Sequence, residues 1–289
     1  MKLYLLSTLT MIAFAANSVF ARLAMAENAI GSVEYSLVRL ASGALILWLI
    51  VHLRRSSGPR EGGTLLSALS LWVYVLGFSV AYLALDTGVG ALIMFATVQL
   101  TMISVGIWRG QRPSLQEWFG LTIAFGAFAY FVSPGLTAPD PIGTSIMIAA
   151  GVGWGVYSLR GASSSDPLGA TAGNFALGTA IMIAVAVLWF AFGSIWEADG
   201  KTPTTIVGLL YATASGAITS GLGYALWYHC LRQLTVTKAS IIQLSVPAIA
   251  AIGGVAFAGE TLTMRTIVCA SLILGGVALA IVARTKKVA

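Results

Sequence analysis

Three separate stretches of this sequence carry aromatic rings at the spacing of one helical turn. Residues four apart, such as Phe78 and Tyr82, lie on the same face of an α-helix. Rings combine apolar contact area with a polar handle and can hold a cation over the ring face, so we expect these faces to bind an amphiphilic ligand. The same stripes also fit ordinary packing, and Tyr82 also fits an interfacial belt. The rings are Tyr74, Phe78, Tyr82, Trp154, Tyr157, Tyr224 and Tyr228.

A second group of candidates is polar and lies well inside apolar stretches. Gln99 and Gln243 carry amides that are costly in lipid unless paired, so both should face the protein interior. Ligand contact and interhelical hydrogen bonding explain them equally well. Asn17 and Ser245 are further candidates for ligand contact. Pro247 frees a backbone carbonyl and is a candidate hinge, although proline kinks also serve packing.

Two ionisable residues are candidates for gating or charge recognition. Arg39 lies about eight residues into its apolar stretch. At that depth it could attract a substrate carboxylate, close an outer gate with Glu34 or Asp86, or snorkel toward the headgroups. His229 has the side chain that titrates near neutral pH, but it also fits a simple interfacial position. We interpret Arg22, which is nearer the surface, as an anchor.

Helices must position these side chains, because the chain is a run of ten apolar stretches. A helix needs roughly 20 residues to cross the bilayer core, and its backbone groups are paired within the segment. We therefore predict an all-α polytopic membrane protein with ten transmembrane helices. The expected spans are 3–22, 31–53, 64–85, 88–108, 114–133, 142–160, 168–193, 204–229, 236–257 and 263–283.

The basic residues indicate how the chain is oriented. Twelve of the 16 lysines and arginines fall on one side of the predicted spans, and the other four are Arg22, Arg39, Lys201 and Arg265. Cytoplasmic loops carry such an excess, so both termini are predicted in the cytoplasm and the protein in a bacterial-type inner (plasma) membrane. The bases sit singly at helix ends, so the net charge of +6 indicates a lipid bilayer as partner rather than nucleic acid.

The composition argues against an enzyme. With 58% hydrophobic and 9% charged residues, the short loops leave no room for a soluble domain. An intramembrane enzyme would need a nucleophile with its base, paired aspartates or a histidine cluster. The two histidines are distant and no carboxylate pair lies deep in a span, so we predict no catalytic residue, metal or cofactor. The same pattern disfavours carboxylate-based proton coupling and leaves facilitated exchange, or coupling through His229.

The second half of the sequence repeats the first. The segment from Tyr224 to Tyr228 aligns with the segment from Phe78 to Tyr82, and Trp154 falls on Asn17. We predict two five-helix repeats, 1–136 and 137–289, which together form one membrane domain. Because five is odd, the second repeat should be inverted, as in many secondary transporters that work by alternating access.

Three motifs resemble the EamA family of the drug/metabolite transporter superfamily. They are Tyr224-Ala-Leu-Trp-Tyr-His-Cys-Leu231, Lys238-Ala-Ser-Ile-Ile-Gln-Leu-Ser-Val-Pro247 and Gly259-Glu260. The resemblance implies export of a small-molecule substrate, commonly an amino acid as in the YddG-type exporters of aromatic amino acids. Drugs or lipophilic cations are the alternative cargo.

The resemblance also implies where the substrate binds. It places a central cavity among spans 1, 3, 4, 6, 8 and 9, with spans 5 and 10 at the periphery. Gln99 stands where the family often has a proline, so the kink expected in span 4 is in doubt. Glu260 is expected to cap or order the turn between spans 9 and 10.

Overall fold

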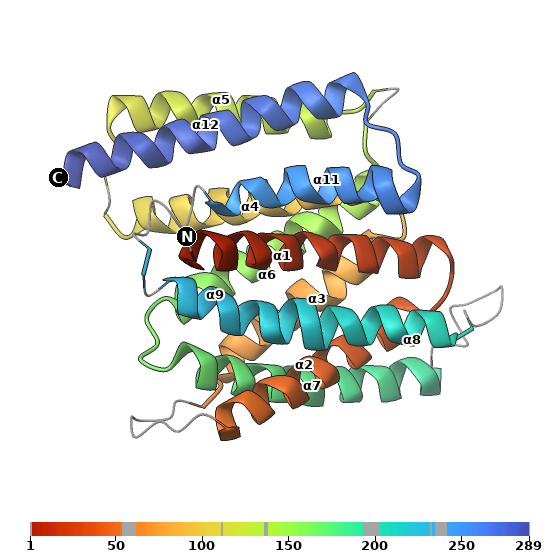
Figure 1. Cartoon of the computed structure of the whole chain (residues 1–289). Coiled ribbons are helices and arrows are strands. Elements are labelled where there is room, and N and C mark those ends of the chain that lie inside the picture. Colours follow the sequence, from red (N-terminus) through yellow and green to blue (C-terminus); the bar gives the residue numbers. More distant parts are fainter. Residues whose placement is uncertain are drawn as a thin grey trace.

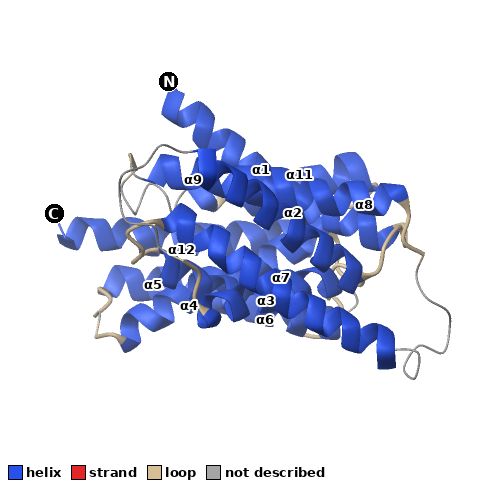
Figure 2. Cartoon of the chain, turned by 90° about the horizontal axis from the view of Figure 1, so that it is seen from below, coloured by secondary structure: helices blue, strands red, loops and turns tan. Residues whose placement is uncertain are grey.

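The computed structural model describes residues 2–53, 62–110, 112–135, 138–192, 203–231, 233–234 and 242–288. Over these residues the chain consists of helices and the loops that join them (Figure 2). The predicted all-α fold class is confirmed. Part of the 238–247 motif and six basic residues of the orientation argument lie outside the described residues, namely Arg54, Arg55, Arg60, Lys201, Arg232 and Lys238.

Most helices follow the predicted spans, but α3 and α11 are shorter than the predicted spans 64–85 and 236–257, and part of the latter span lies outside the described residues. In chain order they are α1 (Lys2–Ala26), α2 (Ser32–Leu53), α3 (Leu65–Ala81), α4 (Thr87–Trp108), α5 (Leu115–Val132), α6 (Pro141–Gly161), α7 (Pro167–Phe192), α8 (Ile206–Thr213), the π-helix η2 (Ala214–Leu222), α9 (Gly223–Leu231), α11 (Ser245–Ala258) and α12 (Met264–Val288). The segments α8, η2 and α9 run on as one stretch.

Length and composition suit these helices to a membrane. Within the described ranges, eight helical stretches are long and apolar enough to cross one, and α8 through α9 together make one of the eight. Two further apolar helices, α3 and α11, are shorter, with 17 and 14 residues. The protein is therefore a polytopic membrane protein, and the count of ten spans stays a prediction.

Side chains in the connecting loops fix several helix starts. Ser114 and Glu117 form a reciprocal capping box at the start of α5. Thr64, Asp140 and Thr205 each accept a bond from a backbone N–H in the first turn of α3, α6 and α8. These caps pair the first N–H groups of a helix, which have no partner inside the helix itself.

The helices form a bundle in which both termini lie at one end (Figure 1). We call this end, which includes Leu53 and Arg160, the terminus side, and the opposite end, which includes Ala26 and Glu260, the far side. Helices α5 and α12 pack together at one edge, and α2 and α7 pack together at the opposite edge. The remaining helices lie between these two pairs.

The packing partners keep the same pattern when the two predicted halves are exchanged. In the predicted repeat, α1 corresponds to α6, α3 to the stretch α8–η2–α9, and α4 to α11. Helix α3 packs on α6, and the stretch α8–η2–α9 packs on α1 in the same way. Helix α4 packs on α6, and α11 likewise packs on α1. Similarly, α3 packs on α7 as η2 packs on α2. Two equivalent five-span halves would produce this pattern. The boundaries 1–136 and 137–289 remain a prediction.

Candidate functional site

Arg39 of α2 is completely buried, with 0% of its surface exposed. Its Nη2 donates to the Tyr74 hydroxyl at 2.7 Å, and both Nε and Nη2 lie 3.4 Å from Oγ of Ser220. The guanidinium carbon lies 5.1 Å from the Tyr74 ring centre and 5.0 Å from that of Phe78, within cation–π range. The snorkelling alternative is therefore wrong, because the side chain is enclosed by protein.

Asn17 of α1 gathers hydroxyl groups from the π-helix beside Arg39. Its Oδ1 accepts from Ser215 at 2.7 Å and from Thr219 at 2.5 Å, and Ser220 Oγ lies 3.5 Å away. Ser220 thus contacts both Asn17 and Arg39. The cluster joins α1 and α2 of the first half to η2 of the second. Asn17 was predicted to contact ligand, whereas sequence reasoning missed the three hydroxyl residues.

The π-helix can supply these hydroxyl groups because it lies against the backbone of α2. A Cβ atom added at Gly216 would lie 2.2 Å from the Arg39 carbonyl oxygen and 2.0 Å from Ser42 Oγ, so only glycine fits this approach. A π-helix has wider turns than an α-helix, and such segments occur frequently at functional sites. The sequence signal was the run Ala214-Ser-Gly-Ala-Ile-Thr-Ser220, which is rich in small and hydroxyl residues for a membrane span.

The predicted aromatic faces meet next to Arg39. Trp154 of α6 is the central ring, 4.8 Å from Tyr74 of α3, 5.2 Å from Tyr224 of α9 and 5.4 Å from Tyr157. Phe78 lies 5.4 Å from Tyr74. Three helices that are distant in sequence therefore contribute to one ring cluster. That these rings bind ligand stays a prediction.

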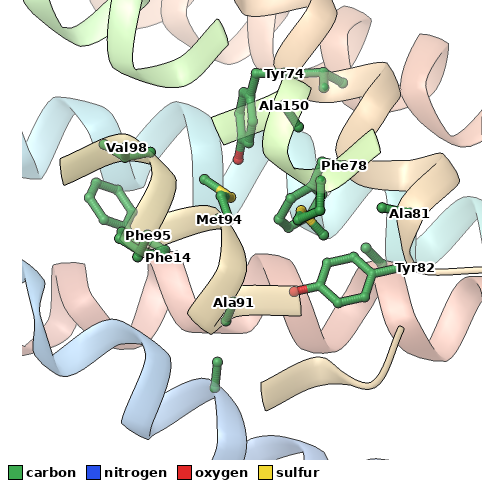
Figure 3. Close-up of a cluster of buried hydrophobic side chains, with 14 of the residues drawn as sticks. Phe14, Tyr74, Phe78, Ala81, Tyr82, Ala91, Met94, Phe95, Val98 and Ala150 are labelled. Atoms are coloured by element: carbon green, nitrogen blue, oxygen red, sulfur yellow. The ribbon is translucent and has the colours of Figure 1, made fainter. Parts of the chain in front are cut away.

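The ring cluster continues along α3 toward the far side. Phe78 and Tyr82 pack edge to face with centroids 4.8 Å apart, and the Tyr82 hydroxyl donates to the Thr87 carbonyl at 3.3 Å. Figure 3 shows Tyr74, Phe78 and Tyr82 along α3, with Met94 and other buried side chains of α4 beside them. Tyr82 is fully buried, which excludes the interfacial-belt alternative.

A chain of hydroxyl groups lies on the terminus side of the rings. The Tyr157 hydroxyl donates to Thr171 Oγ1 at 3.2 Å, and Thr171 Oγ1 donates to the Tyr228 hydroxyl at 3.1 Å. This chain links α6, α7 and α9. Tyr157 and Tyr228 were both predicted from the aromatic pattern, and Thr171 was not.

An ion-pair network joins helices on the far side. Arg22 of α1 lies 3.3 Å from Asp86 and 3.4 Å from Glu260, measured between nitrogen and carboxylate oxygen, and it donates to the Tyr82 carbonyl at 3.1 Å. Arg22 is therefore more than an anchor. Asp86 pairs with Arg22 rather than with Arg39, so the suggested gate between Arg39 and Asp86 is not formed.

Glu260 caps a helix of the other half. Gly259 ends α11 in the left-handed conformation, with φ 65°, which glycine adopts without strain. The Glu260 carboxylate that follows accepts from the Thr87 backbone N–H at 2.7 and 2.9 Å and from the Thr87 hydroxyl at 2.8 Å. The expected cap is thus on α4 rather than on the turn between the last two spans.

The other predicted residues lie outside these contacts. Gln99 is buried in α4, whereas Gln243 is partly buried just before α11. Ser245 is exposed and donates to the Ile242 carbonyl at 2.7 Å, so its hydroxyl is already used locally. Pro247 is buried in the first turn of α11, where its missing N–H leaves no intrahelical bond unmade.

His229 is exposed near the terminus end of α9, away from the rings. Its Nε2 lies 3.2 Å from Nε2 of Gln233. This position fits the interfacial interpretation better than a proton switch at the ring cluster.

Polar cavities lie at both ends of the bundle. On the terminus side, a cavity of about 330 Å³ is lined in part by Thr64, Arg109, Arg160 and Asn174. On the far side, a cavity of about 170 Å³ is lined in part by Asp86, Asp140 and Glu260. A third cavity, of about 760 Å³, lies at the peripheral contact of α5 with α12 and is lined mostly by apolar residues.

The sequence is similar to one protein family and to several known proteins. Residues 141–282 match the model of the EamA-like transporter family. The chain is 40% identical over 285 residues to the uncharacterized protein PA1977 of Pseudomonas aeruginosa, covering 99% of this chain and 96% of that protein. It is 26% identical to the threonine/homoserine exporter RhtA of Salmonella typhimurium, over 81% of this chain and 76% of that protein.

The fold also has a counterpart among solved structures. One crystal structure superposes with a TM-score of 0.63, covering 97% of this chain and 99% of that chain. The two sequences are 16% identical, so this likeness concerns the fold alone.

Proposed function

Because the chain belongs to the EamA-like transporter family, we propose that it is a secondary transporter that exports small amphiphilic metabolites, in particular aromatic or other apolar amino acids. The observation that carries this proposal is the meeting of Arg39, Asn17, the π-helix hydroxyls and the ring cluster in the interior, between helices of both halves. Polar and aromatic side chains at that depth suit a zwitterion with an apolar side chain. The similarity to RhtA, which is a threonine/homoserine exporter, supports amino acids as cargo.

Alternating access supplies the mechanism. The repeats 1–136 and 137–289 are inverted copies. The protein lies in a bacterial-type inner membrane, with both termini on the cytoplasmic side. The Arg22–Asp86–Glu260 network then ties the two repeats together at the outer surface, while the cavity around Thr64 and Asn174 opens toward the cytoplasm. Export requires this network to separate as the repeats rock about the bound substrate.

The charge of the interior argues against the alternative cargo. A buried arginine repels a lipophilic cation, so Arg39 favours zwitterionic or anionic solutes over cationic drugs. The enzyme alternative has less support, because His229 contacts Gln233 at the surface and RhtA, a relative with a stated activity, is an exporter.

A solute panel in liposomes tests the proposal. Purified protein is reconstituted, and flux of labelled threonine, homoserine and aromatic and aliphatic amino acids is measured with and without a pH gradient. We expect saturable flux for at least one of them, and weaker flux in Tyr82→Ala, because the Tyr82 ring belongs to the ring cluster. Absence of saturable flux across the whole panel would contradict amino acids as the substrate class.

A further inference from the structure

We propose that Arg39 binds the carboxylate of the transported solute, which makes the substrate class a small molecule with a carboxylate next to an apolar group. This inference rests on the proposed export function and adds the chemical group by which the protein recognises its cargo. It assigns Arg39, placed between three helices, as the positive half of a buried ion pair that the solute completes.

The first support is uncompensated charge. Arginine stays protonated in proteins, and taking a charge out of water is costly unless it is paired. The partners of Arg39 in the described part of the chain are the neutral groups of Tyr74, Ser220 and the Phe78 ring. Asp86 and Glu260, whose carboxylates form ion pairs, are bound to Arg22 and not to Arg39. A carboxylate brought by the solute would supply the missing charge.

The second support is unused hydrogen-bonding capacity on a fixed side chain. Nη1 of Arg39 is buried and has no hydrogen-bond partner among the described residues. The other nitrogens are held by Tyr74 and Ser220, and two rings lie against the guanidinium. The side chain is therefore held in place with donors to spare, which suits the planar fork of a carboxylate.

The third support is the position of Arg39 between the halves. Arg39 and Tyr74 come from the first half, and Ser220 comes from the π-helix of the second. A carboxylate bound there would contact both halves at once, so its arrival could change how they pack. The resemblance had placed span 2 outside the cavity, whereas the structure places Arg39 of α2 against Tyr74 of α3 and Ser220 of the π-helix.

The surroundings also limit the rest of the ligand. The rings of Tyr74, Trp154 and Tyr224 lie beside the arginine and offer an apolar surface. An amino acid and a simple monocarboxylate share the carboxylate, and they differ in the ammonium group. The monocarboxylate would neutralise the site fully, whereas the ammonium of an amino acid would have to lie against ring faces or amide oxygens.

Paired probes on the unmodified protein test the inference without any substitution. Thermal unfolding of the purified protein is measured in detergent with 3-phenylpropionate, L-phenylalanine and L-threonine, each compared with its own primary amide. We expect at least one acid to bind at least ten-fold more tightly than its amide, in line with a charge-assisted hydrogen bond. Preference for 3-phenylpropionate would identify simple acids, and preference for an amino acid would identify zwitterions. Equal binding of acid and amide in all three pairs, or no binding by any acid, would overturn the proposal.

Substitutions then assign the effect to Arg39. In Arg39→Gln the acid-to-amide ratio should fall to about one, and Arg39→Lys, which keeps the charge and guards against a folding defect, should restore part of it. Arg265→Gln is the matched control, because Arg265 also lies over a tyrosine ring, that of Tyr130, but outside the site. A ten-fold preference that persists in Arg39→Gln would overturn the assignment.

The two proposals fail in different ways. Saturable amino-acid flux combined with equal binding of acids and amides would leave export standing and remove the carboxylate site. Arg39-dependent binding of acids without flux of any solute in the panel would leave the site standing and remove the export function.

Discussion

At the scale of single residues, two buried polar side chains, Arg39 and Asn17, hold most of the polar contacts described in the interior. Sequence patterns alone did not decide their roles. Arg39 contacts Tyr74 and Ser220, and Asn17 accepts from hydroxyl groups that include Ser220. Their bonds cross from the first half to the π-helix. If the site geometry changed, these polar groups would lose their hydrogen-bond partners in an apolar interior. That loss is costly, so the stability of the protein depends on the geometry of the site.

Replacing Asn17 should therefore be costly. Asn17→Ala removes the side-chain acceptor of Ser215, while Thr219 keeps the Ser215 carbonyl as acceptor, so we expect the free energy of unfolding to fall by about 1–3 kcal/mol. Thermal unfolding in detergent measures this. Ser7→Ala is the control on the same helix, because the buried Ser7 hydroxyl has no partner among the described residues and its loss should be nearly neutral. Equal effects of the two substitutions would contradict the account.

At the scale of elements, the π-helix and the α4 cap determine how the halves meet. The π-helix Ala214–Leu222 lies on α2 through Gly216, and Glu260, two residues after the end of α11, caps α4. Both contacts depend on backbone groups of one half lying within reach of the other. They give the bundle two separate connections between its halves, one in the interior and one on the far side.

Gly216→Ala should disturb the first connection. The added methyl group would overlap the Arg39 carbonyl oxygen, so we expect a loss of about 1–3 kcal/mol in the free energy of unfolding together with reduced flux. Gly126→Ala in α5 is the matched control, because a Cβ there meets nothing within 4 Å. The control should be neutral or slightly stabilising, since alanine favours helix. A neutral Gly216→Ala would show that α2 and the π-helix are not in close contact.

Glu260→Gln should weaken the second connection. The amide loses the ion pair with Arg22 and its favourable charge at the start of α4, so we expect about 1 kcal/mol less stability. Hydrogen exchange should speed up in the peptide that contains Thr87. Glu27→Gln, which changes an exposed carboxylate on the same side, should leave this peptide unchanged. Unaltered exchange in Glu260→Gln would argue against the cap.

Sequence patterns predicted the elements better than the contacts between them. Apolar length predicted the helices, and ring spacing predicted which aromatic side chains share a face of each helix, because both depend on local periodicity. The bond from Ser220 to Arg39 and the cap from Glu260 to Thr87 join residues far apart in the chain. No local pattern encodes such pairs, and the π-helix had no spacing signal beyond its run of small and hydroxyl residues.

At the scale of the whole molecule, the protein has three features along its length. Ion pairs join its helices on the far side, polar and aromatic side chains are buried in the interior, and a polar cavity lies on the terminus side. Packing partners keep their pattern when the predicted halves are exchanged. An exporter that works by alternating access must break the Arg22–Asp86–Glu260 network in each cycle. We therefore expect that transport cannot occur unless the ion pairs on the far side separate.

A reversible cross-link across the far side tests this claim most directly. Arg22→Cys and Glu260→Cys are combined in a protein whose buried Cys230 and Cys269 are replaced by alanine, and a short bis-methanethiosulfonate bridges the new pair by forming a disulfide with each cysteine and releasing methanesulfinate. Counterflow of the best labelled amino acid is then measured in liposomes, with each single cysteine variant as control. We predict that counterflow falls to the level of protein-free liposomes when the bridge forms and returns when dithiothreitol cleaves it. Saturable counterflow that continues through a fully bridged protein would contradict the account.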